Sequence, residues 1–251
     1  MRPMYWIVAL GFGLLAINAT PLGAWPGLPV RSHPVTLPLP QPFSIQSPSR
    51  GPLEISRNWA GYVNNHGTFQ SIQASWRVPK LASLGSLAIW VGLGGAPQQR
   101  LLQAGTLTKS TASGTKTILW IEGLPAPLKP ISRNLTPGEA VHIAIHHVHS
   151  HEWALNLQAG SYRQTYNVQY PLTPHSAEWI VEDPLINNHF AVFPRFQDIE
   201  VFYATARNHN GQTETVAQST PIDLRIGNVI HAAPALVNSS TFAVTSSNTS
   251  G

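Results

Sequence analysis

Residues 71–79 read Ser71-Ile72-Gln73-Ala74-Ser75-Trp76-Arg77-Val78-Pro79. Apolar and polar side chains alternate along this stretch until the proline ends it. Because successive side chains of a β-strand point to opposite faces of a sheet, the alternation indicates a strand with one buried face. Proline has no N–H to donate to a neighbouring strand, so we expect the strand to end at Pro79.

Similar short stretches recur through the chain, separated by clusters rich in Gly, Pro, Asn and Ser. They cover residues 87–93, 117–121, 140–148, 153–157, 165–170, 178–181 and 199–204. No window of a dozen residues keeps a helical period, and no Gly-rich phosphate motif follows a strand. The pattern predicts an all-β domain over residues 53–233, built as an antiparallel two-sheet β-sandwich of the concanavalin or jelly-roll type.

The composition excludes several other classes of protein. Of 251 residues only 10% are charged, with 15 Lys and Arg against 11 Asp and Glu, and there is no cysteine. So few charges argue against disorder and against a coiled coil, and the lack of Cys removes disulfides and thiolate metal sites. Lys and Arg are scattered rather than clustered, so we expect no nucleic-acid partner despite the net charge of +4.

Both ends of the chain differ from the domain between them. An arginine and a short apolar run over residues 6–17 indicate a signal peptide at residues 1–24, and hence a secreted protein with no stable membrane span. Residues 25–52 are rich in proline and are interpreted as a linker or a short propeptide. Residues 234–251 are rich in Ser, Thr and Asn, and we expect them to form a frayed tail.

With so few acids, each carboxylate in an apolar strand is a candidate for chemistry. Strand alternation places Glu178, Ile180 and Glu182 on one face, and Glu122 ends another apolar strand. These glutamates are either solvent-facing strand ends or a pair converging in an aromatic cleft. In the second case Glu122 and Glu182 could serve a β-sandwich glycoside hydrolase. A non-catalytic carbohydrate-binding module with stacking tryptophans is a further alternative.

Several sequence blocks, taken in order, resemble the G1 family of peptidases, the glutamic peptidases or eqolisins. The blocks are residues 57–62 (RNWAGY), 74–79 (ASWRVP), 88–95 (AIWVGLGG), 101–106 (LLQAGT), 120–122 (WIE) and 177–183 (AEWIVED).

This resemblance implies a β-sandwich endopeptidase acting on polypeptides at acidic pH, without metal or cofactor, and we expect it to be a monomer. The matched motifs place the catalytic pair on Gln103 and Glu182, the second glutamate of its block rather than Glu178. Trp59, Trp90 and Glu122 match positions that line or support the family's cleft. Such a pair suits hydrolysis, because a carboxylate can activate water and an amide N–H can stabilise the oxyanion.

The sequence departs from the family at several positions. Gly94 and Leu107 stand where fungal relatives carry acids, and residues 122–125 (EGLP) shorten a family motif. These changes reduce the number of acids around Gln103 and Glu182, and they therefore affect the expected pH optimum and substrate pockets.

A run of histidines over residues 142–151 suggests a metal site. On a regular strand His147, His149 and His151 would share a face, where they could bind zinc or copper or simply form a solvated surface. No carboxylate or Cys completes a familiar metal-site spacing, so we predict no metal.

Overall fold

The computed structural model describes residues 53–95, 100–186 and 189–247 of the chain. The predicted signal peptide and the proline-rich segment lie outside the described residues. Within these ranges the secondary structure is β-strand apart from one short 3₁₀ helix, η1 (Val216–Gln218). The predicted all-β class is confirmed.

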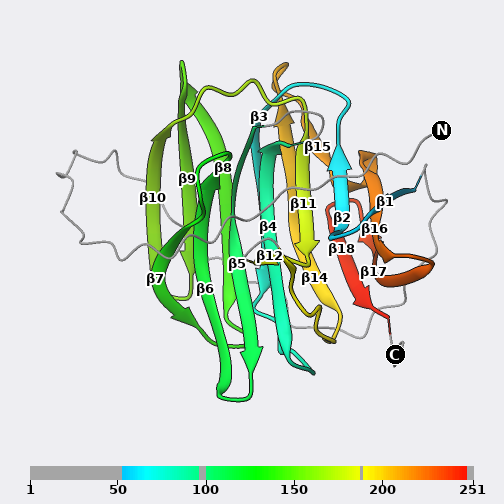
Figure 1. The fold of residues 1–251 in the computed structure, drawn as a ribbon. Coiled ribbons are helices and arrows are strands. Elements are labelled where there is room, and N and C mark those ends of the chain that lie inside the picture. Colours follow the sequence, from blue (N-terminus) through cyan, green and yellow to red (C-terminus); the bar gives the residue numbers. More distant parts are fainter. Residues whose placement is uncertain (1–52, 96–99, 187–188, 248–251) are drawn as a thin grey trace.

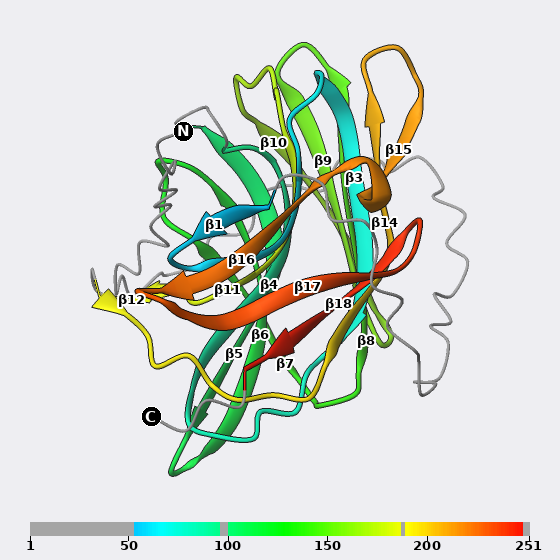
Figure 2. The ribbon, with the colours of Figure 1, turned by 90° about the vertical axis from the view of Figure 1, so that its right-hand side faces the viewer.

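The strands form two layers that pack face to face (Figures 1 and 2). The front layer contains, in order of pairing, β7 (Lys129–Leu135), β6 (Gly114–Gly123), β5 (Leu101–Thr111), β4 (Gly85–Gly94), β11 (Ala177–Glu182), β2 (Trp59–Asn64), β16 (Thr220–Ile226) and β1 (Glu54–Ser56). The back layer contains β10 (Tyr162–Gln169), β9 (Glu152–Ala159), β8 (Ala140–His149), β3 (Phe69–Arg77), β14 (Ile199–Asn208) and β15 (Thr213–Thr215).

Two further strands link the layers into one continuous hydrogen-bonded path. They are β17 (Val229–Asn238), which pairs with β16, and β18 (Thr241–Ser246), which pairs with β14. A separate small hairpin joins β12 (Leu185–Ile186) to β13 (His189–Phe190). Neighbouring strands are antiparallel throughout the described residues, except that β1 runs parallel to β16.

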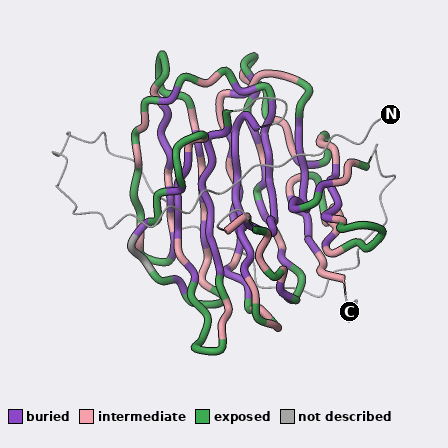
Figure 3. Tube along the Cα trace, viewed as in Figure 1, coloured by how far each residue is buried: buried purple, intermediate pink, exposed green. Residues whose placement is uncertain are grey.

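The main hydrophobic core lies between the two layers. This cluster includes Trp76 of β3, Trp153 of β9 and Trp179 of β11, which are all at most 1% exposed. The Trp76 indole Nε1 donates to Thr106 Oγ1 of β5 at 3.1 Å, which satisfies its polar end across the core. Figure 3 shows the buried residues concentrated in the strands and the exposed ones at the loops.

The predicted strand positions are confirmed. Each of the seven stretches lies within β4, β6, β8, β9, β10, β11 or β14, apart from Tyr170, which follows β10. The opening stretch forms β3, with Ile72, Ala74 and Trp76 in the core.

The predicted tail from residue 234 is wrong. Residues 234–238 belong to β17 and residues 241–246 to β18, with Phe242 and Val244 fully buried in the core. The Ser and Thr residues that suggested a tail flank the short apolar run Phe242-Ala243-Val244 in β18 and fill the turn before it. There Ser240 N donates to Asn238 Oδ1 at 3.0 Å. The domain therefore extends beyond residue 233.

The shared face expected for three histidines is also wrong. A bulge between His147 and His149 breaks the alternation of β8, and His151 lies in the turn that follows. The two side chains have different partners. His147 Nε2 forms a hydrogen bond with the backbone oxygen of Ser150 at 2.9 Å, and His149 Nε2 lies 3.1 Å from Glu152 Oε2. No group of three His, Asp or Glu among the described residues is placed to hold a metal ion.

Candidate active site

The candidate residues lie on the outer face of the front layer, away from the main core. In β11 the side chains of Trp179 and Val181 belong to the core between the layers, whereas Ile180 belongs to a second apolar cluster on the other face. Alternation places Glu178 and Glu182 on the same face as Ile180, as the sequence predicted. These two glutamates are at most 1% exposed, so they are not solvent-facing strand ends.

Strand register arranges this face in rows across β11, β4, β5 and β6. One row contains Glu178, Gly92, Gln103 and Glu122, which are successive partners on the four strands. The row two residues further along contains Ile180, Trp90, Gly105 and Trp120.

The next row contains Glu182, Ala88, Leu107 and Ile118. The register thus brings Gln103, Glu122, Trp90 and Glu182 to one face of one sheet. Trp59 joins them because it pairs with Glu182 on the neighbouring strand β2.

The carboxylate of Glu182 is held by two nitrogen donors. Trp90 Nε1 donates to Glu182 Oε2 at 2.6 Å, and Asn58 Nδ2 donates to Glu182 Oε1 at 3.0 Å. The backbone carbonyl oxygen of Asn58 also accepts a hydrogen bond from the backbone N–H of Asp183, at 2.8 Å. Since nitrogen donors favour the charged form of a carboxyl, they partly offset the cost of burying it.

Gln103 is joined to the second candidate carboxylate. Its Nε2 donates to Glu122 Oε2 at 2.6 Å, and both side chains are at most 3% exposed. An amide nitrogen carries two donors, so one N–H of Gln103 remains for another acceptor. Within the described part of the chain, Gln103 Oε1 and the indole Nε1 of Trp120 are buried and have no hydrogen-bond partner.

Three carboxyl groups on this face or directly beside it have raised pKa values. Burial raises the pKa of Glu122 to about 8, against the opposing hydrogen bond from Gln103. Burial also raises the pKa of Glu182 well above its usual value; the Trp90 hydrogen bond opposes this and the nearby charge of Glu122 adds to it. Burial raises the pKa of Asp183 to about 7.

Tryptophan rings surround the polar groups. Trp59 and Trp90 pack edge to face with ring centroids 5.1 Å apart, and Trp120 belongs to the same cluster. Gly105 makes room for them, because a Cβ at this position would lie 2.6 Å from Trp90 Cβ and 3.0 Å from Trp120 Cζ2. The rings exclude water from the carboxyls, which explains the raised pKa values.

Two contributors to the site were not predicted from the sequence. Asn58 lies inside a block that resembled the family, next to Trp59, but nothing in the sequence marked its side chain as a partner of Glu182. Trp120 stands two residues before Glu122, and strand alternation alone would have placed it on the same face.

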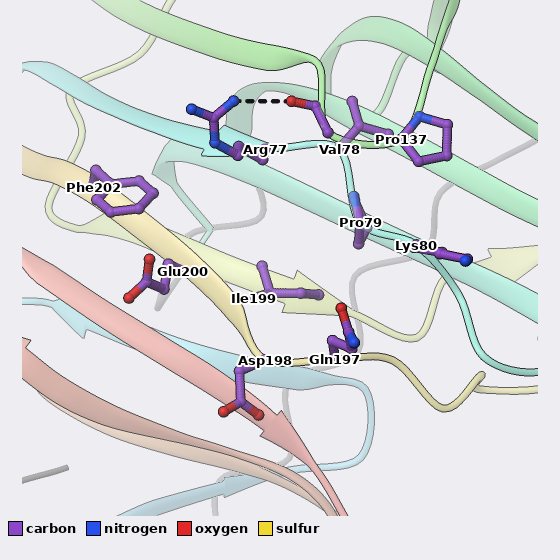
Figure 4. A pocket seen from close by; sticks show the side chains of 11 residues that line it. Arg77, Val78, Pro79, Lys80, Pro137, Gln197, Asp198, Ile199, Glu200 and Phe202 are labelled. Carbon is purple, nitrogen blue, oxygen red and sulfur yellow. Dashed lines mark hydrogen bonds between the residues drawn. The ribbon is translucent and has the colours of Figure 1, made fainter. Parts of the chain in front are cut away.

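The structure also contains a pocket of about 530 Å³ at the other layer (Figure 4). It lies where β3 ends and β14 begins, and Arg77, Lys80, Asp198 and Glu200 contribute charged side chains to it. None of the candidate residues lines this pocket. Among the described residues, no helix has the length and apolar character needed to cross a membrane.

A buried amide bonded to one buried carboxyl, with a second buried carboxyl on the same face of the layer, is an arrangement that can perform acid–base hydrolysis. A sequence model described as the Peptidase A4 family matches residues 57–246. The chain therefore belongs to this family, the G1 glutamic peptidases, as the sequence blocks indicated.

Solved structures of glutamic peptidases share the fold. Scytalido-glutamic peptidase with a transition-state analogue inhibitor is 18% identical, with a TM-score of 0.66, and the match covers 76% of this chain and 98% of that one. The eqolisin SCP-B, in complex with the tripeptide Ala-Ile-His, is also 18% identical, with a TM-score of 0.62 over 76% and 98% of the two chains.

Aspergilloglutamic peptidase from Aspergillus niger is 20% identical, with a TM-score of 0.58 over 64% of this chain and 99% of that one. No curated protein matches the chain by sequence. The two-layer sandwich is thus the fold of glutamic peptidases, and the chain is a glutamic endopeptidase.

Proposed function

We propose that this peptidase hydrolyses polypeptides at acidic pH through Gln103 and Glu182. The observation that carries the proposal is the shared buried face on which Glu182 is held by Trp90 and Asn58, while Gln103 is joined to Glu122. Neither the glycoside hydrolase nor the binding module has a comparable observation in its favour.

The two side chains have complementary roles in this mechanism. Glu182 takes a proton from a water molecule that attacks the scissile carbonyl, and it returns the proton to the leaving amine. The free N–H of Gln103 donates to the oxyanion, while its Oε1, which has no partner among the described residues, can orient the water. The N–H donors of Trp90 and Asn58 oppose the effect of burial and favour the charged form of Glu182, which is the form that takes up the proton.

Acidic conditions suit this arrangement of carboxyls. Two nearby carboxyls do not both ionise easily in a site without water, so a proton on one favours the charge on the other. Because the pKa of Glu122 lies near 8, this group is protonated under acidic conditions. Its neutral carboxyl still accepts the hydrogen bond from Gln103 and no longer opposes ionisation of Glu182.

Turnover of an acid-denatured protein substrate by the purified chain tests the proposal. We expect Gln103→Ala and Glu182→Gln each to lower kcat by about 10²- to 10³-fold or more while the protein stays folded. Val192→Ala is the control, because Val192 is 73% exposed and lies outside the front layer. Full proteolysis by the Gln103 variant would refute the assigned pair, and xylan or glucan hydrolysis lost in Glu122 and Glu182 variants would favour the glycosidase.

We also propose that the protein acts outside the cell after removal of residues 1–24. The apolar run at residues 6–17 and the arginine before it support this proposal. N-terminal sequencing of protein recovered from the culture medium tests it, and an intact Met1 in exported material would contradict removal.

A further inference from the structure

The face that holds the candidate active site continues beyond Glu182 into a cavity of about 490 Å³. Leu107 and Ile118, which stand in the same row as Glu182, line the end nearest the site. Lys109 and Lys116 line the cavity two residues further along β5 and β6. Two residues of a strand span about 7 Å, which is the spacing between the Glu182 row and the lysine row, so the cavity adjoins the Glu182 row.

Two positive charges stand side by side in this cavity. Lys109 and Lys116 are direct partners in the β5–β6 register, and both are exposed. The ion pairs among the described residues, His149–Glu152 and Arg225–Asp223, include neither lysine. Like charges directly opposite each other on neighbouring strands destabilise the pair, so an anion placed between them would be bound favourably.

The rest of the lining suits a side chain with a carboxylate at its tip. Leu107 and Ile118 provide apolar contact on the side toward Glu182, and the two lysines lie beyond them. This combination can hold the methylene groups of an acidic side chain and bind its charged end.

We propose that this cavity is a substrate subsite that selects an Asp or Glu of the polypeptide being cleaved. The proposal rests on the peptidase function proposed above and names the kind of substrate that the site prefers. In this proposal the scissile bond of the substrate lies over Gly105, whose row stands between the rows of Gln103 and Glu182. Lys109 is four residues further along the same strand. An extended substrate covers this distance of about 13 Å with about four residues. The preferred acid therefore lies about four residues from the cleaved bond, on one side of it.

A set of fluorogenic peptides tests the subsite. The peptides share one cleaved sequence and carry a single Glu at positions two to six on either side of the bond, each with a Gln counterpart. At pH 5.5 we expect the Glu peptide to have about a three- to tenfold higher kcat/KM at one position, which is the range for one or two exposed ion pairs. At pH 3 the substrate carboxyl is protonated and the ratio should fall toward one.

Variants of the lysine pair provide the decisive comparison. Lys109→Gln with Lys116→Gln should bring the Glu-to-Gln ratio close to one at pH 5.5, and replacement of both by Glu should invert it. The matched control is Lys80→Gln with Arg195→Gln, which removes two exposed positive charges outside this cavity. A ratio that is close to one in the wild type, or unchanged in the lysine variants, would overturn the subsite.

Binding separates this inference from the proposed function. Fluorescence anisotropy of the labelled Glu and Gln peptides on the Glu182→Gln variant measures the preference without catalysis. If the Glu peptide binds in a lysine-dependent way but the wild-type chain cleaves none of the peptides, the peptidase mechanism is refuted and the subsite is supported. Glu182-dependent cleavage without any Glu preference would refute the subsite and support the mechanism. If neither lysine-dependent binding of the Glu peptide nor Glu182-dependent cleavage is observed, the subsite and the peptidase mechanism are both refuted.

Discussion

The orientation of the Asn58 amide is fixed by a serine two residues before it. Ser56 Oγ donates to Asn58 Oδ1 at 3.2 Å and accepts the backbone N–H groups of Asn58 and Trp59 at 3.3 and 3.1 Å. With its oxygen engaged, the amide presents Nδ2 to Glu182. A reversed amide would present an acceptor, which favours the protonated carboxyl. A side chain without any proton-transfer role thus helps to set the charge of Glu182.

Removal of this amide should alter the pH dependence of catalysis. In Asn58→Ala the carboxylate of Glu182 loses one of its donors, so its pKa should rise further and activity should move to higher pH. A hydrogen bond to a charged group is worth about 1.5–3 kcal/mol, which predicts about a ten- to hundredfold lower kcat at the wild-type optimum. The pH profile of kcat for a protein substrate measures both effects.

A second buried asparagine separates this effect from lost stability. Asn208 Nδ2 donates to Glu214 Oε1 at 2.7 Å, near the start of β15 and away from the candidate site. Asn208→Ala should lower stability and leave the pH profile in place. A profile for Asn58→Ala that coincides with the wild type would contradict the role assigned to this amide.

At the level of elements, local sequence patterns predicted β3, β4 and β11 but missed β2 and β5, which are also buried on both faces over most of their length. β3 has clear alternation and was predicted, whereas residues 101–105 of β5 are buried on both faces and do not alternate. The family motif, not periodicity, identified Gln103 on that strand. Register across four strands decides which residues meet, and no local pattern determines it.

Gly105 tests whether the close packing of β5 keeps the site in shape. A Cβ at Gly105 would lie 2.2 Å from Ile89 O and 2.6 Å from Trp90 Cβ, so Gly105→Ala must displace neighbouring atoms. We expect a loss of about 1–3 kcal/mol in unfolding free energy, as for other overpacked sites, together with reduced activity because Trp90 holds Glu182.

Urea denaturation and kcat measure the two effects of Gly105→Ala. The control is Gly67→Ala, where a Cβ would meet nothing within 4 Å and should change stability by less than about 0.5 kcal/mol. Equal stabilities for the two variants would contradict the account of Gly105.

The last hairpin of the chain should be essential for folding. Phe242 of β18 is fully buried and packs edge to face on Tyr62 of β2, with ring centroids 5.0 Å apart. We expect Phe242→Ala to cost about 3–5 kcal/mol, and a chain ending at residue 233 to fail to fold, since it lacks β18 and half of β17. Denaturation curves and circular dichroism measure the outcome, and a folded, active chain of residues 1–233 would restore the original boundary.

For the molecule as a whole, the small number of acidic residues and the burial of several of them together affect how the free energy of unfolding depends on pH. Of the 11 Asp and Glu residues, five are at most 3% exposed, namely Glu122, Glu178, Glu182, Asp183 and Asp223. Where burial raises a pKa, the folded chain keeps a proton that the unfolded chain releases, so stability falls as pH rises through that interval. Carboxyls whose pKa values are raised by burial therefore favour the folded chain in the acidic range.

Glu122 permits a direct measurement of this effect. Its pKa rises from 4.5 to about 8 in the folded chain, so between these values its contribution to unfolding free energy falls by up to about 1.4 kcal/mol per pH unit. Glu122→Gln removes the titration. We therefore expect the variant to gain stability relative to the wild type as pH rises from 4.5 to 8, in urea denaturation at constant ionic strength. Parallel curves over this interval would rule out a raised pKa.

Two histidines of the back layer oppose this trend. Burial lowers the pKa values of His142 and His146 below 6.5, so the unfolded chain binds protons first as pH falls. Their contribution to stability is complete above pH 6.5 and is lost as pH falls from there through the folded-state values. The variant His142→Gln with His146→Gln should therefore lose less stability than the wild type between pH 6.5 and 4. His151→Gln, at an exposed turn, should follow the wild type. If the double variant also follows the wild type, the two histidines do not limit acid stability, and the carboxyls with raised pKa values, Glu200 of the back layer included, decide the effect of acid on this fold.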